Sequence, residues 1–393
     1  MIEPDFKNIF QESKEVLTGN IRKTNNTLTL HDLVKHYKNK EIVGEESLVC
    51  AMTLAAINNS SFGVEGFSGS GKTYIVDKLI ELLPDVYKIQ QSSELAIFNI
   101  AEKINGSKYI YIPELQKAMQ NRKSPIIEVI KDLTEGKDSN RIVTRRKGSG
   151  VKEFSIKSGV TIIYTLAVEN YFKKDEESSR RLIRLRTDAS ETHLEEIHEY
   201  KAKKRYSIRE SEENKKALEN KVKEHLRECI EMDDVRLIDP FSNQIMNMIP
   251  KTQKSVGYID HYYSLLDGSA KFNFNNRKKA NIDGKTYLLV NLEDHYNVYQ
   301  IYFKEFIQTL KDLENEDENL TTEYASIQEP EWVSFFCSGD NILRESSQLE
   351  QLRLKIPSIV DEWYNSQVCN GILEISTYYE QDKIMIPLKQ NEA

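Results

Sequence analysis

Apolar residues in the first half of the chain come in short runs that alternate between strand and helix periodicity. Continuous apolar runs predict buried strands at 61–65, 86–89, 109–114, 159–166 and 182–185. Apolar residues at helical spacing predict helices at 74–83, 92–104 and 124–133. Alternating strands and helices are typical of an α/β fold in which helices cover both faces of a parallel sheet and ligands bind at the carboxyl ends of the strands.

The second half of the chain has a different pattern. Residues 192–231 interleave charges of both signs, which predicts a long helical stretch with a solvated face. Amphipathic helices at 245–249 and 258–266 predict a helical lid. The acidic run 312–318 predicts a linker.

Beyond this linker, the order of elements predicts a winged-helix-like domain. Two helices within 349–368 precede a hairpin formed by 371–375 and 383–388. No basic recognition helix is present there, so packing or partner binding is favoured over DNA contact. The predicted organisation is an N-terminal helical segment (1–40), a core with the alternating strand and helix pattern (41–200), a charged helix with lid (201–310), a linker (311–320) and the last domain (321–393).

One stretch between a predicted strand and a predicted helix carries the clearest chemistry. Residues 66–73 read Gly-Phe-Ser-Gly-Ser-Gly-Lys-Thr and fit the P-loop pattern G-x-x-x-x-G-K-[ST]. In this pattern backbone N–H groups surround a phosphate chain, Lys72 reaches the β- and γ-phosphates, and Thr73 ligates Mg²⁺. The pattern therefore predicts binding of ATP and Mg²⁺ by Gly66, Ser68, Gly69, Ser70, Gly71, Lys72 and Thr73.

A carboxylate lies at the carboxyl end of the strand predicted at 109–114. Glu114 stands where P-loop ATPases place acidic residues that bind Mg²⁺ or orient the attacking water. Two acids in tandem are usual, but Pro113 occupies the first place and cannot bind a metal. Glu114 is therefore the candidate catalytic carboxylate, for either role or both.

A basic hairpin is predicted at 141–156, with glycines in its turn. It carries Arg141, Arg145, Arg146, Lys147 and Lys152 in a chain that is acidic overall. Contact with nucleic-acid phosphates is one interpretation, and a solvated edge hairpin guarded by charge is the other.

Polar residues near the last two strands complete the candidate site. Thr165 lies near the end of the strand at 159–166, where a hydroxyl can bond to the γ-phosphate or the lytic water, although threonine is also simply a good strand former. Arg181, with Arg180 second, is a candidate arginine finger that neutralises charge on the transferred phosphoryl group of a neighbouring subunit.

Composition narrows the classes of protein that remain. The 393 residues are 30% charged and carry a net charge of −8. Their mean hydropathy of −0.57 predicts a soluble, cytoplasmic protein without a membrane span or signal peptide. Four scattered cysteines suggest neither a zinc site nor a disulfide framework. The acidic balance argues against a protein that coats DNA, but it is compatible with a local basic contact.

The chain resembles an AAA+-type P-loop ATPase. The resemblance rests on the order of its features: the P-loop, Ile112-Pro113-Glu114, the hairpin, the Thr165 strand and Arg180-Arg181. The hairpin is similar to the pre-sensor hairpin of minichromosome maintenance and superfamily 3 helicases. More closely, residues 41–300 resemble archaeal helicase-like ATPases found beside primases and in mobile elements, including the strings Ser178-Ser179-Arg180-Arg181 and Asp188-Ala189-Ser190.

The resemblance implies a sheet in the order 5-1-4-3-2, a ring that is usually a hexamer, and ATP at the subunit interfaces. It also implies that the turn at 41–46 lines the adenine pocket. The first hypothesis is an ATP-dependent DNA helicase or translocase in replication, with primase or other replication proteins as possible partners. The second is a nucleotide-switched loader that unwinds nothing, and a small-molecule kinase fits less well.

Overall fold

The structure is a computed structural model of the chain. It describes residues 28–89, 96–118, 125–144, 151–167, 179–206, 211–232, 235–239, 242, 253–277, 279–282, 285–290, 292–314, 378–380 and 383–385. None of the described helices is both long and apolar enough to cross a membrane.

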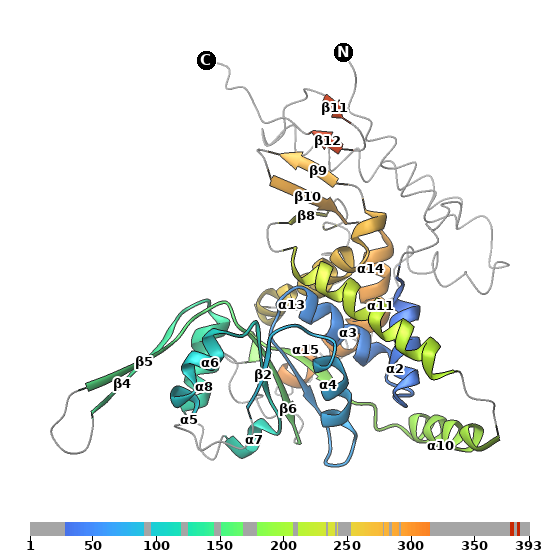
Figure 1. Ribbon diagram of the computed structural model, residues 1–393, viewed down its shortest axis with the longest axis horizontal. Coiled ribbons are helices and arrows are strands. Elements are labelled where there is room, and N and C mark those ends of the chain that lie inside the picture. Colours follow the sequence, from blue (N-terminus) through green and yellow to red (C-terminus); the bar gives the residue numbers. More distant parts are fainter. Residues whose placement is uncertain are drawn as a thin grey trace.

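A five-stranded parallel sheet forms the centre of the first half, as the alternating pattern predicts (Figure 1). Its strands are β1 (Phe62–Glu65), β2 (Val86–Lys88), β3 (Tyr109–Ile112), β6 (Thr161–Leu166) and β7 (Ile183–Arg186). The spatial order is β2-β3-β6-β1-β7, so the P-loop strand lies between β6 and β7. Every residue of β1, β3 and β6 is buried, which explains their continuous apolar runs.

Helices cover both faces of this sheet. Residues on alternate positions of β3 enter different cores: Tyr109 and Tyr111 pack with α3 (Glu46–Ile57) and α4 (Lys72–Ile80). Ile110 and Ile112 pack instead into the core formed on the other face. The second core contains residues of α5 (Ala96–Asn99), α6 (Ala101–Asn105) and α8 (Pro125–Thr134). The short helix after β3, α7 (Leu115–Ala118), also contributes to it.

The predicted hairpin is present as β4 (Ser139–Thr144) and β5 (Val151–Ile156), which pair antiparallel. Its base packs on α5, α6 and α8, and its far end projects away from the central sheet (Figure 1). In the sequence the hairpin lies between α8 and β6. The strand that carries Thr165 therefore directly follows the hairpin along the chain.

The charged stretch divides into two described helices with different environments. α10 (Glu191–Tyr206) has a largely exposed surface. α11 (Glu212–Ile230) instead buries Val222, Leu226 and Cys229 against α2 (Leu30–Asn39) and α3. α11 therefore has the predicted solvated face, but an apolar stripe within the charged sequence also packs into the core, which the prediction missed.

The lid helices pack directly onto α3. α13 (Gln253–Phe272) lies along α3 so closely that a Cβ on Gly268 would stand 2.2 Å from the Leu54 carbonyl oxygen. Only glycine permits this approach of the two backbones. The remaining helical elements of this layer are η2 (Phe274–Asn276), α14 (Leu292–Val298), the π-helical turn η3 (Tyr299–Phe303) and α15 (Lys304–Glu314).

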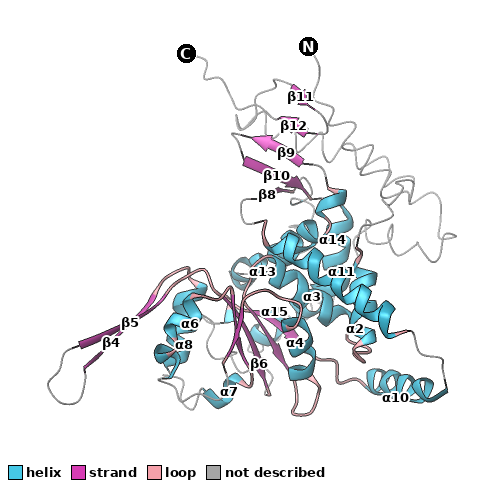
Figure 2. Cartoon of the chain, viewed as in Figure 1, coloured by secondary structure: helices cyan, strands magenta, loops and turns pink. Residues whose placement is uncertain are grey.

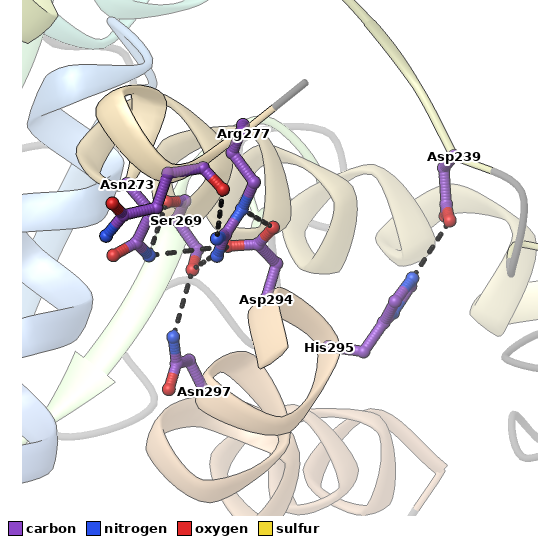
Figure 3. Close-up of polar contacts among 8 residues, drawn as sticks. Asp239, Ser269, Asn273, Arg277, Asp294, His295 and Asn297 are labelled. Atoms are coloured by element: carbon purple, nitrogen blue, oxygen red, sulfur yellow. Dashed lines mark hydrogen bonds and ion pairs between the residues drawn. The ribbon is translucent and has the colours of Figure 1, made fainter. Parts of the chain in front are cut away.

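A buried polar network fixes the lid helices to one another (Figure 3). The Arg277 guanidinium donates two hydrogen bonds of 2.7 Å to Asp294 at the start of α14. Ser269 on α13 donates to the same carboxylate at 2.8 Å. His295 lies 3.0 Å from Asp239, so a second polar contact ties α14 to the segment after β8 (Arg236–Ile238). Charged groups that are buried in this way stabilise only when paired, so the pairing specifies how these helices dock.

A second sheet lies beyond the lid helices from the P-loop sheet (Figure 2). Its order is β11-β12-β9-β10-β8, formed by Tyr378–Glu380, Lys383–Met385, Lys279–Ile282, Lys285–Leu289 and Arg236–Ile238. β12 pairs with β11, a nearer segment than the predicted partner at 371–375. The first residues of the predicted linker, 311–314, are helical and belong to α15. The rest of that linker, the predicted helices within 349–368 and the helix at 245–249 lie outside the described residues.

An ion pair with no exposure to solvent joins the P-loop strand to its neighbour. Glu65 ends β1, and its carboxylate accepts two hydrogen bonds from Arg184 of β7, at 3.0 and 2.9 Å. Both side chains are 0% exposed. Removing one member of such a pair leaves an uncompensated charge in the interior.

We predict that Arg184→Met lowers the free energy of unfolding by about 3–5 kcal/mol, because Glu65 then lies buried without its counter-charge. The double variant Glu65→Leu/Arg184→Met should recover most of that loss. Arg186→Met is the matched control, since its ion pair with Glu305 is partly exposed and weaker. Urea unfolding followed by circular dichroism measures all three. Equal losses for Arg184→Met and Arg186→Met would contradict the prediction.

Candidate nucleotide-binding site

The P-loop connects the carboxyl end of β1 to the first residue of α4, which is the position that phosphate binding requires. Gly71 caps α4 with φ of 81°, a left-handed conformation that a residue with a side chain rarely adopts. No side chain caps the first turn of α4, so its backbone N–H groups face an incoming anion. The residues present therefore fit a phosphate chain.

Lys72 lies folded over the loop. Its ammonium group donates to the Phe67 carbonyl oxygen and, at 3.2 Å, to the Ser70 hydroxyl. The side chain is buried, whereas Thr73 beside it is exposed. Lys72 can exchange these loop contacts for phosphate oxygens, and the Thr73 hydroxyl is accessible to Mg²⁺.

A threonine that the sequence did not single out supports the loop from the next strand. Thr187 follows β7, and its hydroxyl donates to Ser70 at 2.9 Å. A Cβ on Gly66 would stand 2.3 Å from the Thr187 hydroxyl oxygen, so Gly66 is required by this close approach. Thr187 lies just after β7, the strand beside the P-loop strand, and this position is the feature that could have identified it.

Glu114 and Thr165 are brought together across neighbouring strands. The Glu114 backbone N–H donates to the Thr165 hydroxyl at 2.9 Å. Glu114 has φ of 50°, a strained value for a residue with a side chain. Its carboxylate is partly exposed and pairs with Lys117. The strand end thus holds the backbone of Glu114 rigidly and leaves its carboxylate at the surface.

The two arginines lie on different surfaces. The Arg181 guanidinium donates to the Lys131 carbonyl oxygen at 3.1 Å and pairs with Glu135 at the end of α8. Arg180 is exposed, and its side chain lies against Gly257 of α13. Within this chain Arg181 therefore contacts the end of α8.

The structure describes part of the basic hairpin. The Arg141 guanidinium stands over the Phe98 ring, 5.2 Å from its centre, at the root of the hairpin. Lys152 pairs through its backbone with Val143. Arg145, Arg146 and Lys147 lie outside the described residues.

The turn before α3 forms a buried polar cluster beside α10. Glu45 is 6% exposed and accepts a hydrogen bond of 3.1 Å from the Asp188 backbone N–H. His193 lies 3.6 Å from the same carboxyl oxygen. Burial raises the pKa of Glu45 to about 8. Since Asp188 adjoins Thr187, this cluster connects the turn at 41–46 with the P-loop.

The raised pKa of Glu45 predicts a pH-dependent stability. Its ordinary value is 4.5, so between about pH 4.5 and 8 the folded chain holds a proton that the unfolded chain has released. Stability from this group is therefore complete below pH 4.5 and is lost as the pH rises to about 8. Glu45→Gln keeps the acceptor and removes the titration. The melting temperature of the variant, relative to that of the wild type, should rise as the pH increases from 5 to 8. A difference that stays constant over this range would show that burial does not raise the pKa of Glu45.

Comparison with known families agrees with this geometry. Residues 38–124 match the family described as magnesium chelatase, subunit ChlI. The match spans α3, β1, the P-loop, α4, β3 and Glu114. No curated protein matches the chain.

The matched segment is about a fifth of the chain, and it contains the P-loop residues described above. The match supports an AAA+ P-loop ATPase. ATP and Mg²⁺ are the cofactors that this similarity implies, and the P-loop with its bare helix terminus fits both.

Proposed function

We propose that the chain is the subunit of an AAA+ ring, usually of six copies, that hydrolyses ATP to move along or unwind DNA during replication of a chromosome or mobile element. The observation that supports DNA as the partner is the projecting hairpin β4–β5, whose turn sequence is basic (Figure 1). A local basic projection on an acidic chain can contact phosphates without attracting nucleic acid over its whole surface.

The site residues take distinct roles in this proposal. The P-loop amides and Lys72 hold the phosphates, and Thr73 ligates Mg²⁺. Glu114 orients the attacking water, since Pro113 leaves no second acid for that task. Thr165 fixes the Glu114 backbone through the 2.9 Å hydrogen bond and lies where its hydroxyl can face the γ-phosphate.

The arginines act between subunits. Arg181, with Arg180 as second candidate, reaches the γ-phosphate of the neighbouring subunit as an arginine finger. Its pairing with Glu135 holds the guanidinium at the end of α8 until the neighbour's nucleotide competes for it. A guanidinium is suited to this exchange because it remains charged and binds carboxylate and phosphate with the same geometry.

One observation favours a second function. Pro113 removes the acid that usually accompanies Glu114, so turnover is expected to be slow. A slow ATPase works better as a nucleotide-dependent switch that loads or recruits other proteins, such as a primase, than as a motor. Strand displacement on a forked duplex separates the two, because a loader shows none at any protein concentration.

We predict that Glu114→Gln lowers the rate of ATP hydrolysis about 10²- to 10⁴-fold and leaves ATP binding intact, because a neutral amide cannot polarise the attacking water. Lys117→Ala removes the ion-pair partner of Glu114 and is the matched control, for which turnover should change little. Steady-state hydrolysis with a parallel binding assay checks this. Full activity in Glu114→Gln would remove Glu114 from the reaction.

We predict that single-stranded or forked DNA stimulates hydrolysis, that Lys72→Ala abolishes the turnover, and that light scattering gives the mass of a hexamer.

Arg145→Ala/Arg146→Ala should lower DNA affinity and reduce the salt slope of binding to single strands by about 1.4, the effect of two lost phosphate contacts. Lys157→Ala is the control, because this lysine lies at the hairpin root and pairs with Asp138. Unchanged DNA affinity in the double variant would refute the hairpin assignment.

A further inference from the structure

Tyr111 lies two residues before Pro113, which stands where a second acid is usual. Residues two apart on a strand share a face, so Tyr109 and Tyr111 lie on the same face of β3 (Tyr109–Ile112), and a continuation of the strand would put position 113 on it too. The core contacts agree, since Tyr109 and Tyr111 pack with α3 and α4. Pro113 presents no ligand on this face, whereas Tyr111 has a side chain long enough to extend toward the strand end.

The Tyr111 hydroxyl is surrounded by nucleotide-site groups. The residue is 0% exposed. Its hydroxyl lies beside the hydroxyls of Thr73 on the P-loop and Thr165 on β6. It has no hydrogen bond of good geometry within the part of the chain that the structure describes. A buried hydroxyl without a partner is costly, and sites of this kind are usually completed by a ligand or water.

The ring of Tyr111 is held in place from α4 and β2. The Lys88 ammonium stands 5.1 Å from the ring centre and pairs with Asp77 at 2.6 Å. A tyrosine hydroxyl is a neutral hydrogen-bond donor, so it suits a phosphate oxygen.

Tyr109 on the same strand shows what a satisfied tyrosine looks like here. Its hydroxyl donates to the Ala56 carbonyl oxygen at 2.9 Å and lies 3.3 Å from Asn59. The two tyrosines thus differ in function although they share a strand, a face and full burial. Tyr109 connects β3 to α3, while the hydroxyl of Tyr111 faces the P-loop.

We propose that the Tyr111 hydroxyl recognises the γ-phosphate of ATP, donating a hydrogen bond to a γ-phosphate oxygen at the strand end where Pro113 replaces an acid. This inference rests on the proposed nucleotide site. It makes Tyr111 a residue that distinguishes ATP from ADP, because ADP lacks the group that the hydroxyl contacts.

Tyr111→Phe tests the proposal, since it removes only the hydroxyl, and Tyr109→Phe is its matched control. Titration calorimetry with Mg²⁺ would use a non-hydrolysable imido analogue of ATP and, separately, ADP. Tyr111→Phe should weaken binding of the ATP analogue about 10-fold or more, as expected for a lost hydrogen bond to a charged group, and leave ADP affinity unchanged. Tyr109→Phe should leave both affinities unchanged.

Thermal unfolding without nucleotide gives a second readout. Tyr111→Phe should melt at the wild-type temperature or above it, because an unpaired buried hydroxyl has been removed, whereas Tyr109→Phe should melt lower. Wild-type affinity for the ATP analogue in Tyr111→Phe, with binding lost in Lys72→Ala, would overturn the role of Tyr111 alone. Failure of the wild type to bind the analogue would overturn the nucleotide site with it.

Discussion

The buried pair of Glu65 and Arg184 is the interaction on which the nucleotide site depends. Glu65 is the last residue of a strand that is buried throughout, and the P-loop begins at the next residue. A carboxylate can lie there only if a positive charge accompanies it, and β7 supplies that charge. The pair therefore fixes β7 beside β1, and with it the position of Thr187, which contacts the P-loop.

The lid helices surround the same pair. The His261 ring N–H on α13 donates to the Arg180 carbonyl oxygen at 2.8 Å. α13 in turn packs on α3, and the network around Asp294 holds α13 to α14. The lid thus contacts the chain just before β7, and Thr187 after β7 contacts the P-loop. This arrangement gives a physical route by which the nucleotide state and the lid position can influence each other.

Pro113 replaces one of the two acids that usually end this strand. The roles of that pair therefore fall to several different residues. Glu114 keeps a carboxylate at the surface, in a strained backbone conformation fixed by Thr165. On the face toward α4 the chain presents hydroxyl groups, from Thr73, Thr165 and Tyr111, in place of a second charge. Hydroxyl groups hold phosphate and water more weakly than a carboxylate holds Mg²⁺, which is consistent with a slow ATPase.

The sequence by itself determined the parallel sheet, the P-loop and the hairpin, because each depends on local pattern: continuous apolar runs, glycines at fixed offsets, and a glycine turn between paired segments. It also identified Glu114 by its place after a strand. The tertiary structure alone decided the pairing of Glu65 with Arg184, the contact of Thr187 with Ser70 and the orphaned hydroxyl of Tyr111. The partners of the first two lie more than a hundred residues apart, and only the order of strands brings them together. The apolar stripe of α11 was hidden for a related reason, since the charges around it dominate the sequence and only packing against α3 reveals which face is buried.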